Sequence, residues 1–138
     1  MGFSTPALRK IGYTATDDVI YQDTAVYTNN TRNWQQIITG KLIETVADSS
    51  VLRFKCDLKS SGTGLQYKAY MQMLFDGVVV WEETDTDNTY TTYSTDIDMT
   101  NYKRNTVLSV EIKSQSVGTD TTSLKNFTLC GKQSPFVF

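Results

Sequence analysis

The chain has 138 residues, of which 39% are hydrophobic, 12% are aromatic and 20% are charged, and its formal net charge is −2. A chain of this length and composition forms one domain with a real core, which excludes wholesale disorder. The sequence contains no basic block, which argues against nucleic acid as a partner, and its apolar runs are too short and interrupted for a membrane span.

Residues 1–17 are expected to form an extended N-terminal arm. This stretch lacks the apolar core of roughly 7–15 residues that a secretory signal needs. Either the chain is the mature form of an exported protein, or the protein is made and used without export through a signal peptide; we expect the second, with synthesis in the cytoplasm.

The first expected strand covers residues 19–28, and a turn follows at 29–33. The next segment, 34–46, has two interpretations. Apolar residues recur every fourth position there, as in a helix stripe, but Gly40 and several β-branched residues favour strands. We predict two strands that meet near Gly40.

Residues 51–59 carry the clearest strand pattern. Leu52, Phe54, Cys56 and Leu58 fall on one face and charged residues on the other, which is typical of a half-buried strand. Residues 65–75 alternate in the same way, with Leu65 and its alternate neighbours predicted to face the core. The Asp-Gly pair at 76–77 predicts a two-residue hairpin that returns through 78–81.

Further strands are expected at 90–99, 108–113 and 124–130. The sequence therefore predicts an all-β domain, a single β-sandwich over residues 18–132 with about eight or nine antiparallel strands. Jelly-roll topology is the leading candidate. Residues 133–138 are expected to be a short C-terminal tail with apolar side chains.

The sequence offers little catalytic chemistry. It contains no histidine, which removes histidine-activated nucleophiles and imidazole metal ligands. Cys56 is expected to face the core and Cys130 to face outward, as two free thiols. Asp96 and Asp98 share one strand face about 7 Å apart, and we interpret them as the solvent side of the strand rather than a catalytic pair.

No cofactor or metal is expected, with one alternative left open. A shallow calcium site could use loop carboxylates, although the EF-hand spacing is not met and solvated side chains are the simpler interpretation. The residues concerned are Asp85, Asp87 and Asp120.

Aromatic residues are the more informative set. Exposed rings can stack on sugars or on partner side chains with little loss of entropy. Tyr70, Trp81 and Tyr90 are the candidates for glycan stacking. The alternative, favoured for Trp34 and Trp81, is that these rings cap the ends of the core.

Residues 51–131 resemble small β-sandwich domains of phage virion and tail proteins, and more loosely galactose-binding-like carbohydrate modules. The similarity lies in the segments FKCDLKSS, FDGVVV, YTTYSTDI and LKNFTLCG. It implies a jelly-roll-like sandwich with a role in adhesion or assembly, and it transfers no binding residue. The bulky, acidic segment VWEE at 80–83 departs from the small polar residues usual in such domains.

These observations predict a non-enzymatic structural protein of a virion, a capsid decoration or tail-associated protein that forms homo-oligomers or binds other virion proteins. The alternative is a carbohydrate-binding module, with glycans as partners. The expected assembly contacts are Pro6, Leu8, Phe136, Val137 and Phe138.

Overall fold

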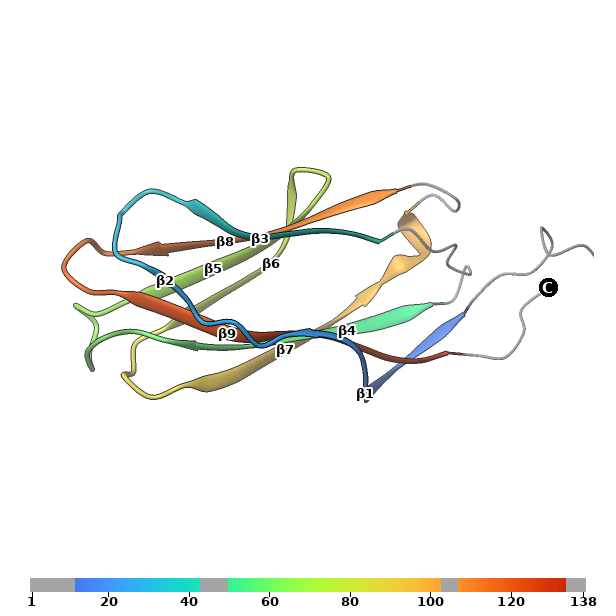
Figure 1. Cartoon of the computed structure of the whole chain (residues 1–138), viewed down its shortest axis with the longest axis horizontal. Coiled ribbons are helices and arrows are strands. Elements are labelled where there is room, and N and C mark those ends of the chain that lie inside the picture. The colour runs from blue at the N-terminus through green and yellow to red at the C-terminus, as the bar shows by residue number, and fades with distance from the viewer. Residues whose placement is uncertain (1–11, 43–49, 103–106, 134–138) are drawn as a thin grey trace, which may run out of the picture.

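Figure 1 shows a computed structural model of the chain, which describes residues 12–42, 50–102 and 107–133. Within these ranges nine strands form two antiparallel sheets that pack face to face. The predicted all-β sandwich is confirmed. The strands in chain order are β1 (Tyr13–Asp23), β2 (Tyr27–Asn29), β3 (Gln35–Leu42), β4 (Val51–Lys59), β5 (Ala69–Phe75), β6 (Val78–Asp85), β7 (Thr91–Asp98), β8 (Leu108–Ser116) and β9 (Thr122–Gln133). A short 3₁₀-helix, η2 (Met99–Asn101), follows β7.

The strand order is that of a jelly roll. The five-stranded sheet runs β1-β9-β4-β7, with β2 also paired to β9, and the four-stranded sheet runs β3-β8-β5-β6. The antiparallel pairs are nested along the chain, from β5 with β6 outward through β4 with β7 and β3 with β8 to β1 with β9. Successive nested pairs alternate between the two sheets, as in one long hairpin wrapped into a double sheet.

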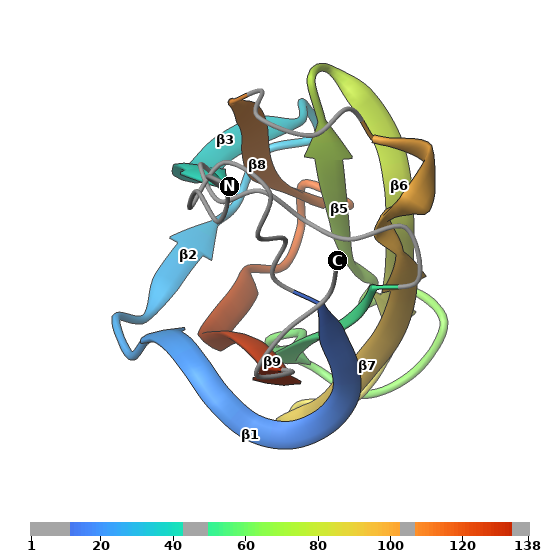
Figure 2. The same cartoon turned by 90° about the vertical axis from the view of Figure 1, so that its right-hand side faces the viewer.

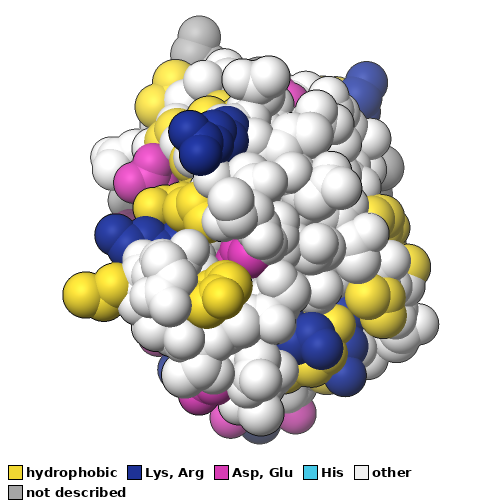
Figure 3. Space-filling view, turned by 90° about the vertical axis from the view of Figure 1, so that its left-hand side faces the viewer, with side chains coloured by type: hydrophobic (Ala, Val, Ile, Leu, Met, Phe, Trp, Pro, Cys, Tyr) yellow, Lys and Arg dark blue, Asp and Glu magenta, His cyan; other side chains and the backbone are white. Residues whose placement is uncertain are grey.

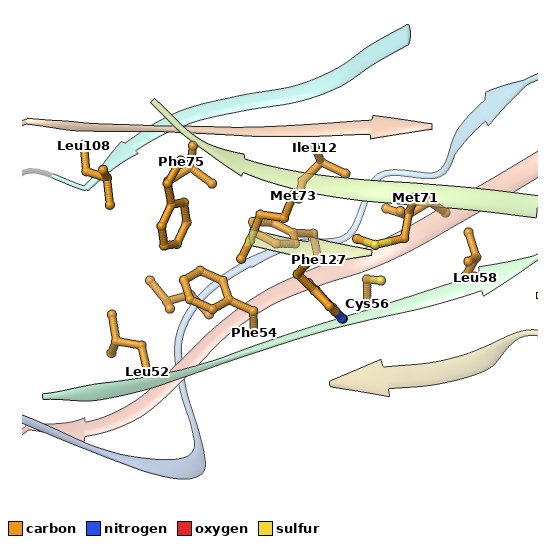
Figure 4. Close-up of a cluster of buried hydrophobic side chains, with 14 of the residues drawn as sticks. Leu52, Phe54, Cys56, Leu58, Met71, Met73, Phe75, Leu108, Ile112 and Phe127 are labelled. Atoms are coloured by element: carbon orange, nitrogen blue, oxygen red, sulfur yellow. The ribbon is translucent and has the colours of Figure 1, made fainter. Parts of the chain in front are cut away.

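Alternating side chains from the two sheets form the core. On β4, every second residue from Leu52 to Leu58 is buried, as the sequence pattern predicts. Phe54 lies at the centre, with its ring 5.7 Å from that of Phe75 and 6.2 Å from that of Phe127. Figure 4 shows Phe54 and Phe127, from the five-stranded sheet, and Phe75, from the four-stranded sheet, pointing into the space between the two sheets.

The predicted hairpin is also confirmed. Asp76 and Gly77 connect β5 to β6 and have positive φ angles of 49° and 83°. This is the backbone geometry that a type I′ turn needs at both central residues.

Four features of the strands differ from the sequence-based prediction. β1 begins at Tyr13, so part of the expected arm pairs with β9, and β9 extends to Gln133, the first residue of the expected tail. Gly40 does not separate two strands, because β3 runs through it in register with β8. Leu65 precedes β5 and is 77% exposed, since the strand begins only at Ala69.

Hydrogen bonds close two parts of the sandwich margin. Where β6 lies beside β7, the Tyr93 hydroxyl donates to Asp85 Oδ2 at 2.7 Å. Where β2 lies beside β8, Asn29 Nδ2 donates to the carbonyl oxygen of Ser114 at 2.7 Å. The rest of the margin between β1 and β3 has no such closure among the described residues, and Figure 2 shows β1 along the bottom of the view and β3 at the upper left, with β2 between them.

Candidate functional site

The candidate site is an apolar cavity of about 390 Å³ between the two sheets, at the margin where β1 and β3 lie. A cavity of this size falls within the range of small-ligand sites, roughly 300–1,000 Å³. Its described lining comes from five strands, namely Tyr13, Ile20 and Tyr21 on β1, Ile38 to Leu42 on β3, Leu52 and Phe54 on β4, Val110 on β8, and Phe127 and Leu129 on β9.

One inward position of β3 beside the cavity carries no side chain. Ile38, Gly40 and Leu42 pair with Ile112, Val110 and Leu108, whose side chains are all buried. Partners in an antiparallel pair share a face, so Gly40 lies on the inner face of β3, and it is exposed there because the cavity opens to solvent. A Cβ atom built on Gly40 would meet no other atom within 4 Å.

The two strands that flank the cavity are sheet edges. Among the described strands, β1 pairs only with β9 and β3 pairs only with β8, so each leaves one side of its backbone open. An edge strand presents N–H and C=O groups that can pair with another chain.

Apolar side chains continue from the cavity onto the surface of β1. Val19, Ile20 and Tyr21 are 60%, 46% and 53% exposed, and the last two also line the cavity. Interior apolar lining and exposed apolar surface are therefore continuous at this margin. Large contiguous patches of exposed apolar side chains are features of contact sites.

Ion pairs hold the adjoining part of β1 against the outer face of β4. β1 is irregular between Thr14 and Val19, and Asp17 within this stretch accepts hydrogen bonds from Arg53 at 3.0 Å and Lys55 at 3.5 Å. Hydrogen bonding to Arg53, reinforced by the charge of Lys55, lowers the pKa of Asp17. These exposed ion pairs lie beside the part of β1 that borders the cavity, and each contributes little to stability.

Asp96 and Asp98 have structural partners. Asp96 receives two hydrogen bonds from the Arg53 guanidinium, at 2.8 and 3.2 Å, which lower its pKa. Asp98 caps η2 by accepting from the Thr100 N–H, which also lowers its pKa. A general acid near neutral pH needs a raised pKa, so the arrangement is the opposite of the one that acid catalysis requires.

The predicted assembly contacts cannot be placed. Pro6, Leu8, Phe136, Val137 and Phe138 lie outside the described residues.

The three predicted stacking residues have different surroundings. Trp81 is only 6% exposed, and its indole N–H donates to Glu83 at 2.8 Å, so it belongs to the core and the stacking role predicted for it is corrected. Tyr90 is half-buried, and the ammonium groups of Lys59 and Lys125 lie 4.8 and 4.2 Å from its ring centroid. These lysines make its ring a poor platform for a sugar.

Tyr70 is half-buried on the outer face of the four-stranded sheet. Trp34, which is 37% exposed, packs edge-on against it with ring centroids 6.3 Å apart. Gln115 is directly opposite Tyr70 on β8, and Gln72 follows on the same face of β5. Aromatic rings beside neutral amides are suited to a polyhydroxylated, uncharged ligand.

The loops after β2, β4, β6 and β8 gather at one end of the sandwich, at the left of Figure 1. Figure 3 views this end and shows hydrophobic side chains in separate patches between charged ones, not one apolar surface. Within the described ranges, no three acidic or cysteine side chains come together in a group that could hold a metal ion.

Two of the loop carboxylates are buried. Asp85 is 3% exposed and accepts from the Asp87 N–H at 2.6 Å and from Tyr93. Asp120 is 5% exposed, and neither of its carboxylate oxygens makes a hydrogen bond of good geometry with a described residue. Burial raises the pKa of Asp120, and the backbone N–H groups of Val117 and Ser61, which lie nearby without that geometry, offset this effect only in part.

Replacing Asp120 with asparagine removes a buried charge but keeps a buried polar side chain, so it should stabilise the protein at neutral pH by about 1 kcal/mol, the extra cost of desolvating a carboxylate that lacks a well-formed hydrogen bond. Because the pKa is raised above its ordinary value of 3.8, the folded state favours the protonated carboxyl. The destabilisation is absent below the unfolded pKa and develops as the pH rises through the folded pKa. Urea unfolding of both proteins at pH 3 and pH 7 should show the difference only at pH 7. An equal difference at both pH values would contradict this account.

The two cysteines are free. Cys56 lies in the core, and burial raises its pKa. Cys130 pairs with Arg53 and so faces outward as predicted, and it is nevertheless only 1% exposed. Burial raises the pKa of this thiol as well.

No helix among the described residues is long and apolar enough to cross a bilayer. No protein family model matches the chain, and no curated protein matches its sequence.

Proposed function

We propose that this chain is a non-enzymatic structural protein of a virion, a capsid decoration or tail-associated protein that acts through contacts with copies of itself and with other virion proteins. The observation that carries the proposal is the open margin of the sandwich, where two edge strands flank an apolar cavity and exposed apolar side chains. An edge of this kind favours association. Jelly rolls occur in capsid proteins, which supports the virion assignment by analogy of fold alone.

Replacing Ile20 with lysine should abolish self-association. Ile20 lies at the open margin and is 46% exposed, so a charge there would have to be desolvated in any contact. Light scattering should give an oligomer for the wild-type chain and a mass near 15.6 kDa for the variant. Val78→Lys is the matched control, because Val78 is 65% exposed at the hairpin away from this margin, and it should keep the wild-type mass.

The virion assignment has its own test. Antibodies raised against the purified protein should label intact particles from a culture in which the gene is expressed during infection. Labelling that is confined to soluble protein, with bare particles, would contradict the proposal.

A second candidate function is carbohydrate binding, favoured by the Trp34–Tyr70 pair on the outer face of the four-stranded sheet. This pair replaces Trp81 and Tyr90 as the expected stacking platform, because one of those rings is buried and the other is flanked by lysines.

Trp34→Ala should reduce binding to any glycan retained by the wild-type chain at least about tenfold, the loss of roughly 1.4 kcal/mol of contact energy. A glycan array followed by titration calorimetry would measure the change. Tyr90→Ala should bind as the wild type does. Equal losses in both variants would point away from the Trp34–Tyr70 pair, and an array without any retained glycan would remove this candidate.

A further inference from the structure

Gly40 keeps the cavity open, and a glycine within a strand needs a reason. Glycine destabilises a strand interior and often marks a place where another backbone or a ligand approaches closely. Nothing in the backbone requires glycine there, since the φ angle of Gly40 lies outside the left-handed region, unlike those of Gly64, Gly77 and Gly118.

We propose that this cavity receives Phe136 and Phe138 of a second copy of the chain, whose residues 134–138 add as an extended strand at the margin between β1 and β3. The inference rests on the proposed assembly function and names the contact through which copies join. Residues 134–138 lie outside the described part of the chain, so the proposal concerns the site that they occupy on a neighbour.

The volume suits two aromatic rings. An apolar cavity of about 150 Å³ binds one benzene molecule. The cavity of about 390 Å³ has room for two rings of that size. Its described lining is apolar except for Thr39 and Lys41, so apolar groups are the chemistry that it accepts.

The flanking strands suit a strand as the occupant. β1 and β3 both present an open backbone edge at the margin where the cavity lies. A segment that pairs with either edge gains main-chain hydrogen bonds, while alternate side chains enter the pocket and supply specificity. A free small molecule would leave these backbone groups unused.

The sequence of the segment fits this geometry. Side chains two positions apart in a strand project from the same face about 7 Å apart. Phe136 and Phe138 would thus point together into the cavity, with Val137 on the opposite side. Pro135 lacks an N–H group, which an edge strand tolerates.

The first experiment fills the cavity in the full-length chain. Gly40→Phe places a ring in the space that the donor segment needs, and Val78→Phe places the same ring at a position of the β5–β6 hairpin that is 65% exposed and outside the cavity lining. Light scattering over a concentration series should show self-association weakened at least about tenfold in Gly40→Phe and unchanged in Val78→Phe. Thermal unfolding of Gly40→Phe should give a Tm no lower than that of the wild type.

The second experiment uses the wild-type chain and does not depend on how the variant folds. A synthetic peptide with the sequence of residues 132–138, KQSPFVF, should compete with the donor segment and reduce the mass to that of the monomer. The control peptide KQSPSVS, in which serine replaces both phenylalanines, should leave the oligomer intact.

The outcomes separate the two proposals. An oligomer that Ile20→Lys breaks, but that Gly40→Phe and the peptide leave intact, would keep the assembly function and overturn strand donation. A lower Tm in Gly40→Phe with unchanged mass would mean that another part of the same copy fills the cavity, which also overturns it. If light scattering shows that the wild-type chain is a monomer, and the antibody does not label intact particles, both the assembly function and the strand donation are ruled out.

Discussion

Replacing Phe54 with alanine is expected to lower the free energy of unfolding by about 4 kcal/mol, within the range of roughly 3–5 kcal/mol for truncating a buried aromatic residue. Phe54 is 1% exposed and contacts the rings of Phe75 and Phe127 from the two sheets. It also lines the cavity, so truncation enlarges a space that the surrounding strands already leave unfilled. The other core side chains keep the two sheets apart, so the sheets cannot move together to fill the enlarged cavity.

Urea unfolding followed by tryptophan fluorescence would measure this loss. Val78→Ala is the control, because Val78 is 65% exposed and its truncation should change the free energy by less than about 0.5 kcal/mol. A loss below about 2 kcal/mol for Phe54→Ala would show that the cavity and the core around it collapse together.

Replacing Asp85 with alanine is expected to lower the free energy of unfolding by about 3 kcal/mol. Two donors would lose their acceptor, the Tyr93 hydroxyl and the Asp87 N–H, and hydrogen bonds to a charged group contribute about 1.5–3 kcal/mol each. The contact with Tyr93 also joins β6 to β7, so its loss opens one side of the sandwich.

A double-mutant cycle with Tyr93→Phe isolates this contact. The two single variants should be non-additive by about 1–2 kcal/mol, since each removes the same hydrogen bond. Additive losses would mean that Asp85 acts through the Asp87 turn alone.

The parts of the fold that local pattern determines could be predicted. The buried face of β4 follows from strict alternation, and the β5–β6 turn follows from an Asp-Gly pair that tolerates positive φ. Each depends only on neighbours in sequence. The nested pairing, in contrast, places residues in contact that lie far apart along the chain.

The cavity could not be predicted for this reason. In the sequence alone, Gly40 indicates a break between two strands. Only its pairing with Val110 in the structure shows that it lies on the inner face of one continuous strand. A local signal was present, since Ile38, Gly40 and Leu42 alternate as core positions of one strand. It could be recognised only by treating 35–42 as a single strand.

Burial at the strand ends was also missed. Asp85 reads as a solvated loop carboxylate, yet the Tyr93 hydroxyl on a neighbouring strand compensates its burial. The sequence makes Trp81 a candidate for an exposed ring. In the structure its ring lies in the core, and its indole N–H donates a hydrogen bond to Glu83. Both outcomes depend on tertiary partners that no local window contains.

The nested topology also sets the order in which the molecule assembles. The β5–β6 hairpin closes the shortest loop, and each further pair needs a longer closure at greater entropic cost. We expect folding to begin at this hairpin and to proceed outward, with the pairing of β1 to β9 forming last and opening first. The strand beside the cavity is therefore the one that a partially unfolded chain releases earliest, which leaves it available for exchange between newly made copies.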